Sequence, residues 1–277
     1  MINCNGNIQD SSNYAIENNR GFLFGDTIFE TIKVNGTKIL FLEEHYLRLM
    51  ASMRICRMEI PMNFTMEFME EEILKLIELQ TIKVSNRIRF TFFRDAEGFY
   101  CPASNDVQFI ITCSELSSDK YSFSTAKYEV ELFKDFHVSK HLLATLKTNN
   151  KMINVVASIF AKENNFQNCL LINEDKNVVE ATNGNLFMKI GSQLITPPIS
   201  DGCLNGIMRK QIIAIVNKME TIEMIEKSIS PFDLQKADEL FISNVITGIQ
   251  PITKYRKKEF TSEVAEEISD LLNALIN

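Results

Sequence analysis

The chain has 277 residues and a formal net charge of −7, and 45% of its residues are hydrophobic. This length supports one elaborate domain or two smaller ones, and the excess of acids argues against nucleic acid or an anionic membrane surface, which need a basic patch. The sequence lacks the ~20 consecutive apolar residues of a membrane span and the features of a signal peptide. Its six cysteines are scattered. We therefore expect a cytoplasmic protein with reduced thiols.

The first third of the chain is predicted to combine β-strands with two helices. Asn35-Gly36 stands between two runs of strand-forming residues, and this dipeptide favours a tight β-hairpin turn. Apolar residues recur at helical spacing over 42–57 and again over 66–79, which predicts two amphipathic helices. A loop that contains glycine and proline is expected over 95–105. The expected strands are Thr27–Val34, Lys38–Phe41, Asn86–Arg94 and Val107–Cys113.

The second half of the chain alternates between short strands and helices, a pattern typical of an α+β fold. The polar stretch Ser114–Tyr121 precedes it and suits an inter-domain linker. Asn149 or Asn150 is placed to cap a helix that begins at 151, and Asn205 is placed to cap the helix after it. The expected helices cover 151–164, 206–218, 230–235 and 262–275, and the expected strands cover 127–133, 169–172, 178–180, 185–190, 193–195, 220–225, 239–243 and 249–255.

The histidines His137 and His141 have a spacing that can suit a metal site. On a helix, residues four apart lie on one face, as in His-Glu-x-x-His sites. Val138 stands where that motif has its glutamate, and the sequence offers no third ligand nearby. We therefore expect two loop or surface histidines and no bound metal.

Two single residues have surroundings that suit carbonyl and ring-nitrogen chemistry. Lys147 follows apolar residues and precedes polar ones, as at a point where a buried segment emerges into a loop. A partly desolvated lysine can form a Schiff base, although a single lysine taken alone is most often an ordinary surface residue. Glu180 follows two valines, and a carboxylate at a strand end can hold a pyridinium nitrogen protonated. The alternative for Glu180 is a solvated turn between two strands.

Two further segments suit the binding of an anion. The segment GCLNGIMR at 202–209 places glycines just before a helix, where backbone N–H groups and the helix dipole attract phosphate. A tight turn with an asparagine cap explains that segment equally well. His45 and Arg48 share one face of a helix, and arginine suits bidentate contact with phosphate, but an amphipathic surface helix has the same pattern. None of these features decides the function alone, and their order along the chain makes the case.

Taken in order, these segments resemble the class IV aminotransferases, which are the fold-type IV pyridoxal-phosphate (PLP) enzymes. That family includes branched-chain aminotransferases, D-amino-acid aminotransferases and aminodeoxychorismate lyases. The similarity extends from about residue 20 to residue 252, with the motifs in family order. The matching segments are RGFLFGDTIFETI at 20–32, HYLRL at 45–49, LKTNN at 146–150, EATNGNLF at 180–187, TPP at 196–198, GIMR at 206–209 and ADELF at 237–241.

The resemblance implies a role for each matching residue. Lys147 would hold PLP as the internal aldimine and then move the proton on the substrate's Cα. Glu180 would pair with the pyridine nitrogen, and Arg48 would bind the phosphate. The further cofactor contacts would come from the backbone N–H groups of Ile207 and Met208, from Leu204 packed on the ring and from Asn244 at the phosphate. The substrate pocket would include Phe29, Arg89, Thr182 and Asn183.

Three features bear on the reaction within the family. NGIMR at 205–209 and Asn244 are more similar to aminodeoxychorismate lyases, because branched-chain enzymes usually have Thr-Gly-Thr near the position of SNV at 243–245. Arg89, in contrast, resembles the arginine with which branched-chain enzymes bind a second carboxylate. The stretch Glu97–Cys101 has neither the arginine nor the histidine of the carboxylate trap found in D-amino-acid enzymes.

The resemblance thus implies an α+β, two-domain, fold-type IV PLP enzyme with the D-amino-acid/branched-chain aminotransferase-like fold. A smaller N-terminal domain would cover 1–118 and a larger PLP-binding domain 119–277, with the cofactor in the cleft between them, and the enzyme would be a homodimer. Its substrate would be a small amino compound, preferably 4-amino-4-deoxychorismate, with elimination of pyruvate to leave p-aminobenzoate. The alternative is a branched-chain L-amino acid transaminase that uses 2-oxoglutarate. A binding homologue without catalysis is the minor alternative, and the presence of Lys147, Glu180 and Arg48 counts against it.

Overall fold

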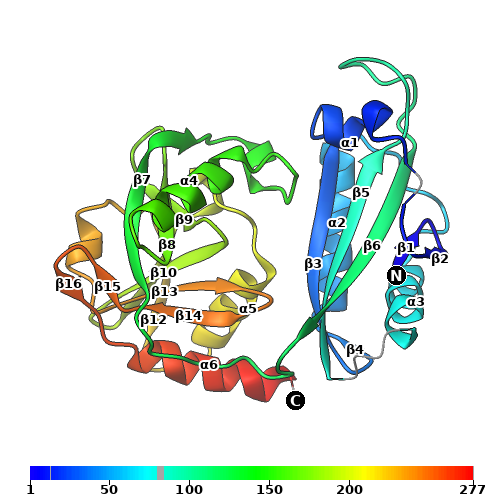
Figure 1. Cartoon of the computed structure of the whole chain (residues 1–277). Helices are drawn as coiled ribbons and strands as arrows, with labels where there is room; N and C mark the ends of the chain where they lie inside the picture. The colour runs from blue at the N-terminus through cyan, green and yellow to red at the C-terminus, as the bar shows by residue number, and fades with distance from the viewer. Residues whose placement is uncertain (13, 80–83, 277) are drawn as a thin grey trace. The chain divides into compact units, whose positions relative to one another are not determined.

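The computed structural model describes residues 1–12, 14–79 and 84–276, and it divides into two compact units (Figure 1). Unit 1 comprises Met1–Asp119 together with Leu146–Asn150, and unit 2 comprises Lys120–Thr145 with Lys151–Asn277. The segment Leu146–Asn150, which carries Lys147, therefore groups with the N-terminal part of the chain, although both of its neighbours in sequence belong to unit 2. The predicted linker contains the boundary at residue 119.

Unit 1 is a six-stranded antiparallel sheet with the strand order β2-β1-β6-β5-β3-β4. Helices α2 and α3 cover one face of this sheet (Figure 1). The strands are β1 (Ile2–Cys4), β2 (Asn7–Gln9), β3 (Thr27–Asn35), β4 (Lys38–Ile39), β5 (Ser85–Arg94) and β6 (Val107–Leu116). The helices are α1 (Arg20–Leu23), α2 (Leu42–Ile55) and α3 (Met66–Glu78), with a short 3-10 turn η1 (Ile16–Asn18).

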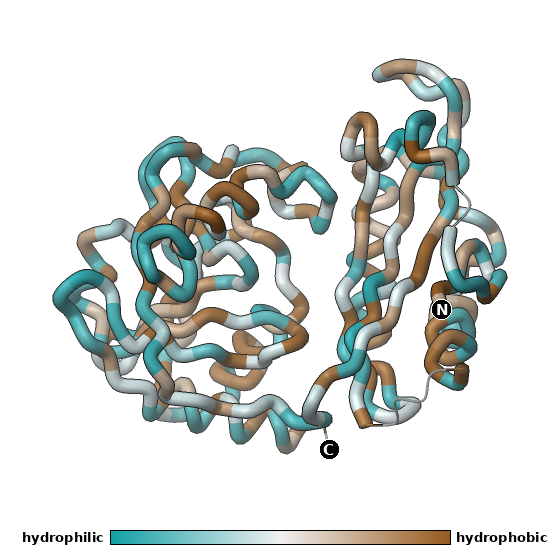
Figure 2. Tube along the Cα trace, viewed as in Figure 1, coloured by the Kyte–Doolittle hydropathy of each residue, from teal (hydrophilic) through white to brown (hydrophobic). Residues whose placement is uncertain are grey.

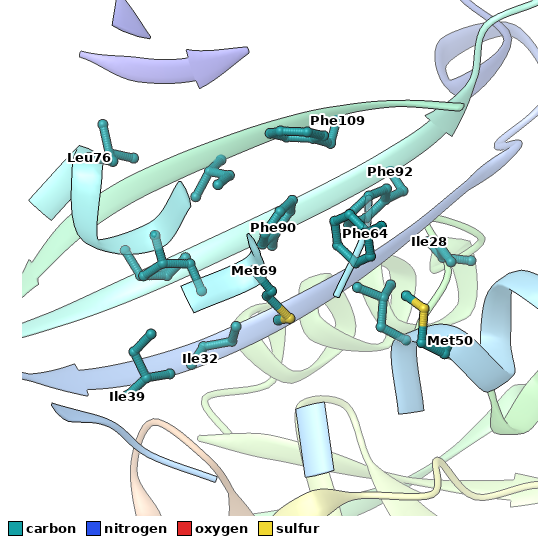
Figure 3. Close-up of a cluster of buried hydrophobic side chains, with 14 of the residues drawn as sticks. Ile28, Ile32, Ile39, Met50, Phe64, Met69, Leu76, Phe90, Phe92 and Phe109 are labelled. Carbon is teal, nitrogen blue, oxygen red and sulfur yellow. The ribbon is translucent and has the colours of Figure 1, made fainter. Parts of the chain in front are cut away.

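The core of unit 1 lies between the sheet and its two helices, and it is rich in aromatic rings. Figure 3 shows Phe64, Phe90, Phe92 and Phe109 gathered in it, and the rings of Phe90 and Phe92 stack with centroids 4.8 Å apart. Because successive side chains of a strand point to opposite faces, the residues between these core positions lie on the other face of the sheet. That second face carries two of the candidate substrate residues, Phe29 and Arg89.

The predictions for unit 1 are confirmed for its long elements. Both predicted helices form, and Asn35-Gly36 closes the β3–β4 hairpin, with Gly36 at a φ of 57° that a residue without a Cβ adopts at little cost. Strand β4 is shorter than predicted, because Phe41, with a φ of 57°, turns the chain away from the sheet as the N-cap residue of α2. The strands β1 and β2 were not predicted, since each has only three residues and no clear alternation.

Unit 2 is built on a sheet that closes on itself. Strand β14 ends at Ile252, and β15 begins two residues later and pairs in parallel with β7, so the strands surround a common interior core (Figure 1). In Figure 2 hydrophobic residues follow these strands, and hydrophilic residues occupy the outer turns. The strands are β7 (Glu129–Val138), β8 (Asn168–Asn173), β9 (Val178–Ala181), β10 (Gly184–Ile190), β11 (Gln193–Thr196), β12 (Glu223–Glu226), β13 (Glu239–Asn244), β14 (Gly248–Ile252), β15 (Lys254–Tyr255) and β16 (Lys258–Glu259).

Helices lie against the outside of this closed sheet. Helix α4 packs on β7 and β8 around Phe133 and Leu171, while α5 and α6 contact β13. The helices are α4 (Met152–Glu163), α5 (Ile207–Val216) and α6 (Glu263–Ile276), with 3-10 turns η2 (Leu142–Thr145), η3 (Ile199–Asp201) and η4 (Asp233–Gln235).

The predicted caps of α4 and α5 are wrong. The N-cap residues are Lys151 and Gly206, and neither cap makes a side-chain hydrogen bond to its helix. Both helices begin one residue later than predicted, so the asparagines at 149, 150 and 205 stand outside the cap position. For α5 the missing side-chain cap leaves its first N–H groups available for a ligand.

Within the described residues, no helix is long and apolar enough to cross a membrane, and no group of three or more acids, histidines or cysteines could hold a metal ion. His137 lies on β7 and His141 follows it in a turn, and both are exposed, as predicted.

Candidate active site

Lys147 is held on the edge of strand β3 in unit 1. The N–H of Phe29 donates to the carbonyl of Lys147 at 2.8 Å, and the N–H of Asn149 donates to the carbonyl of Thr27 at 3.2 Å. Ile28 and Thr148 form an antiparallel bridge between these two bonds. The segment therefore behaves as a short added strand, which fixes the direction of the Lys147 side chain.

Phe29 brings Lys147 and Arg89 to the same face of the sheet. The Lys147 Nζ lies 4.7 Å from the centroid of the Phe29 ring, and the Arg89 guanidinium carbon lies 3.6 Å from it. Arg89 is fixed further by Nη2, which donates to the Asn149 side chain at 2.8 Å, and by Nε, which donates to Thr91 at 3.2 Å. Burial and the charge of Arg87 lower the pKa of Arg89, but an arginine remains protonated at neutral pH.

Arg48 lies on the opposite, helix-covered side of β3, where it pairs with Glu30. Arg48 Nε donates to Glu30 Oε1 at 2.8 Å, and Arg48 Nη2 donates to Glu30 Oε2. His45 Nδ1 is 2.7 Å from Glu30 Oε2. Burial opposes the ionisation of Glu30, yet the Arg48 charge and the hydrogen bonds from His45 and Arg48 outweigh it and lower the Glu30 pKa to about 2.

His45 is fully buried and in contact with this pair. Burial lowers the His45 pKa below its usual value, Glu30 opposes that effect, and the charges of Arg48 and Lys147 add to it. A neutral His45 that donates from Nδ1 to Glu30 leaves Nε2 as an acceptor, and Nε2 has no hydrogen-bond partner among the described residues. Because the charge of Lys147 contributes to the lowered pKa of His45, the edge of β3 brings Lys147 near the cluster of Glu30, His45 and Arg48.

In unit 2, Glu180 and Asn185 hold the loop that precedes α5. The two residues are directly opposite each other on β9 and β10, so their side chains lie on one face. Glu180 Oε2 accepts the N–H of Leu204 at 2.9 Å, and Asn185 Nδ2 donates to the carbonyl of Leu204 at 2.8 Å. Both side chains are buried, so Leu204 is clamped on the outer face of the closed sheet, beside the Glu180 carboxylate.

The N-terminus of α5 lies beside this clamp, and its surroundings suit a phosphate group. Ile207 and Met208 form the first turn of α5, which has no side-chain cap. Ser243 lies opposite Asn185 on β13, and its buried Oγ has no hydrogen-bond partner among the described residues. Uncapped N–H groups at a helix N-terminus and an unpaired buried hydroxyl are the donors that a phosphate needs, so these residues fit the phosphate of PLP.

Three other predicted residues make contacts within unit 2. The Asn244 side chain accepts the N–H groups of Ile246 and Thr247 at 3.0 and 2.9 Å, so in this structure it shapes the turn between β13 and β14. Thr182 and Asn183 both hydrogen-bond the buried side chain of Asn168, at 2.6 and 2.9 Å. A role for these three residues with cofactor or substrate stays a prediction.

The structure thus gathers the predicted residues into two sets, one in each unit. Phe29, Arg48, Arg89 and Lys147 belong to unit 1, and the remaining predicted residues belong to unit 2. Sequence reasoning missed Glu30, which lies inside a quoted motif, and Asn185 and Ser243. Asn185 lies opposite Glu180 on β10, and Ser243 lies opposite Asn185 on β13, a register that only the strand pairing reveals.

Gly206 allows the close approach of the loop to Asn185, and we expect Gly206→Ala to weaken cofactor binding. A Cβ at position 206 would lie 2.0 Å from the Asn185 Oδ1, so the loop or Asn185 must shift and the first N–H groups of α5 must move with it. The expected loss of PLP affinity is about tenfold, which corresponds to one impaired charge-assisted hydrogen bond. Spectroscopic titration with PLP measures it, and Lys210→Ala, an exposed change on the same helix, should leave the affinity unchanged. An unchanged affinity of Gly206→Ala would show that the α5 N-terminus does not hold the phosphate.

Comparison with known proteins places the chain in a family. A family model described as amino-transferase class IV matches residues 27–255. The D-alanine aminotransferase of Staphylococcus epidermidis is 26% identical over 245 residues, which cover 85% of this chain and 81% of that protein.

Solved structures of several activities share the fold. The branched-chain aminotransferase of Thermoproteus uzoniensis superposes with a TM-score of 0.88 at 19% identity, over 99% of this chain and 94% of that one. A Legionella pneumophila protein assigned as a 4-amino-4-deoxychorismate lyase superposes with a TM-score of 0.85 at 24% identity, over 96% of each chain. These similarities confirm the predicted fold-type IV architecture, and the chain belongs to the class IV aminotransferase family of PLP-dependent transaminases and lyases.

Proposed function

We propose that this chain binds PLP and that Lys147 bonds covalently to the cofactor. The observation that carries this proposal is the placement of Lys147 on β3, where two backbone hydrogen bonds fix it and Phe29 and Arg89 flank it. Bound PLP supplies an electron-accepting ring. Lys147 then serves as the base that removes the substrate's Cα proton and as the acid that returns it.

The other residues bind and orient the cofactor. Glu180, which is buried, keeps a proton on the ring nitrogen, since an ionised carboxylate stabilises a neighbouring cation. Arg48, the first N–H groups of α5 and the Ser243 hydroxyl bind the phosphate. Leu204, clamped by Glu180 and Asn185, packs against the ring and keeps water away from it.

Within the family, we propose 4-amino-4-deoxychorismate lyase as the preferred activity. The supporting features are NGIMR at 205–209 and Asn244. Arg89, whose guanidinium contacts the same Phe29 ring as Lys147 and can bind a substrate carboxylate, favours instead the second candidate, a branched-chain L-amino acid transaminase that uses the dicarboxylate 2-oxoglutarate. Both activities begin with the same residues, so the cofactor site does not separate them.

Three parallel assays distinguish the candidate reactions. The purified protein is incubated with 4-amino-4-deoxychorismate, with leucine plus 2-oxoglutarate, and with D-alanine plus 2-oxoglutarate. We expect p-aminobenzoate and pyruvate to form in the first assay. Turnover confined to the second or third assay would contradict the lyase assignment, and a protein that stays colourless after the addition of PLP would contradict the cofactor assignment.

We further propose a homodimer, located in the cytoplasm. Family resemblance supports the dimer, and unit 1 exposes the aromatic side chains of Phe99 and Tyr100, which are 85% and 89% accessible. The six free cysteines suit a reducing compartment.

Charged substitutions test the dimer. Light scattering after gel filtration should give twice the 31.8 kDa chain mass, and the double substitution Phe99→Asp/Tyr100→Asp should shift the protein towards the monomer. A wild-type protein that is monomeric at micromolar concentration would contradict the dimer.

A further inference from the structure

The face of the unit 1 sheet that points away from α2 and α3 has two rows of residues that each contain an arginine, and in these rows the β3 residues Thr31 and Lys33 are buried. Strands β3, β5 and β6 are in register, so Thr31, Arg89 and Thr112 lie side by side, and Lys33, Arg87 and Ser114 form the next row. The core residues Ile32, Ile88 and Phe90 alternate with these positions and face the helices. The first, near row contains Arg89 beside Lys147, and the second, far row lies two residues further along the strands, about 7 Å away.

The two arginines differ in how they are engaged. Arg89 is half-buried and held by Thr91, Asn149 and the Phe29 ring. Arg87 is exposed, and its guanidinium makes no hydrogen bond or ion pair with any residue that the structure describes. An exposed arginine with its donors turned to solvent keeps the full capacity for bidentate contact with a carboxylate.

This face is positively charged, although the chain as a whole has a net negative charge. The protein has 36 acids and 29 bases, yet both rows hold cations and hydroxyl groups and no carboxylate. Burial lowers the Lys33 pKa, and the charge of Asp119 opposes that effect. A positive field of this kind attracts anionic ligands and opposes the binding of a purely aliphatic side chain.

From this arrangement we infer that the far row is a second anion-binding position and that the amino substrate carries two anionic groups. The near row binds the carboxylate closest to the reacting nitrogen, and Arg87 with Ser114 binds the second one further along the sheet. This inference rests on the proposed function for the role of Lys147, and it deepens that function by assigning the second carboxylate of a dicarboxylate substrate to Arg87 and Ser114. Arg87 thereby becomes a specificity-determining residue, because a branched-chain amino acid offers it no partner.

Binding of dicarboxylates of increasing length tests the inference without catalysis. The full-length protein, loaded with PLP, is titrated calorimetrically at constant ionic strength with succinate, glutarate, adipate, pimelate and suberate. We expect the affinity to rise once the chain is long enough to reach from the near row to the far row. Arg87→Gln should lower the affinity for the longer members about tenfold and change that for succinate less than twofold, whereas Arg89→Gln should weaken all of them.

The control is Arg54→Gln, an exposed change of the same charge on α2, which covers the opposite face of the sheet. It should not alter any of the affinities. The inference is overturned if the affinity does not depend on length, or if Arg87→Gln behaves like Arg54→Gln while both keep the wild-type melting temperature.

The failure of the proposed function would look different. A protein that never develops the colour of bound PLP but still prefers long dicarboxylates would reject the PLP role and retain the two-anion site. A coloured and active protein whose affinity does not depend on the length of the dicarboxylate would retain the PLP role and reject the two-anion site.

Discussion

Lys147→Ala is expected to abolish the visible absorbance of bound PLP and to lower activity by about three orders of magnitude or more, because it removes both the covalent attachment and the proton carrier. Borohydride treatment of the wild-type protein should fix the cofactor mass on the peptide that contains Lys147. Lys147→Arg keeps the positive charge near Phe29 and His45 but cannot form the covalent bond, so it should lose the absorbance as well. Absorption spectra, peptide mass spectrometry and the three substrate assays measure these effects.

Lys151→Ala serves as the matched control, since it removes one lysine charge four residues further along the same connection. It should retain the absorbance and most of the activity. If the Lys147 variants keep the band, or if the cofactor mass appears on another lysine, the assignment of Lys147 is wrong.

Glu30→Gln is expected to lower the free energy of unfolding by about 3–5 kcal/mol, which is the usual cost when one partner of a buried ion pair is removed. Glu30 is 1% accessible and Arg48 is 9% accessible, so the guanidinium would stay buried without a counter-charge. Chemical denaturation of the apoprotein measures the loss separately from cofactor binding. The double variant Glu30→Leu/Arg48→Met replaces the pair by apolar side chains and should recover most of the stability, though not the affinity for PLP.

The Glu30–Arg48 pair also predicts how the free energy of unfolding changes as the pH falls. The folded Glu30 pKa of about 2 lies below its ordinary value of 4.5, so its contribution to stability is present above about pH 4.5 and declines as the pH falls towards 2. Glu30→Gln removes this titration, so its unfolding free energy should fall less steeply than that of the wild type between pH 4.5 and the lowest pH at which the protein folds. Parallel curves for the two proteins would show that Glu30 does not carry the effect.

The elements that could be predicted from the sequence are those with a long and regular pattern. Helices α2 and α3 and strands β3 and β5 each span nine residues or more. An element of that length contains several repeats of the apolar pattern. The α5 cap shows where the same reasoning fails. Asn205 is a favoured capping residue, but beside the clamped Leu204 the N-cap is Gly206 and the helix starts at Ile207, and tertiary contacts of that kind leave no local signal.

The prediction of Lys147 as the aldimine lysine rests on ordered motifs in the sequence, and the family match confirms the class of enzyme. Sequence order is informative here because each motif is expected to bind a different part of PLP, so the chemistry would constrain residue type at each position. Motifs do not state which face of a strand a residue occupies, however. Arg48 and Lys147 both belong to quoted motifs, and only the structure places them on different sides of β3.

What the sequence determined by itself is the family and its cofactor, because those depend on residue identities in a fixed order, and the same order predicts Lys147 as the residue that binds the cofactor. The tertiary structure decided which side chains act together. Strand register joins Glu180 to Asn185 and Ser243, burial pairs Arg48 with Glu30, and the bridge between Ile28 and Thr148 brings Lys147 to Arg89. These partners are 15 or more residues apart in most cases, and no local pattern encodes a pairing across such distances, since hydrogen bonds between strands form only after the chain folds.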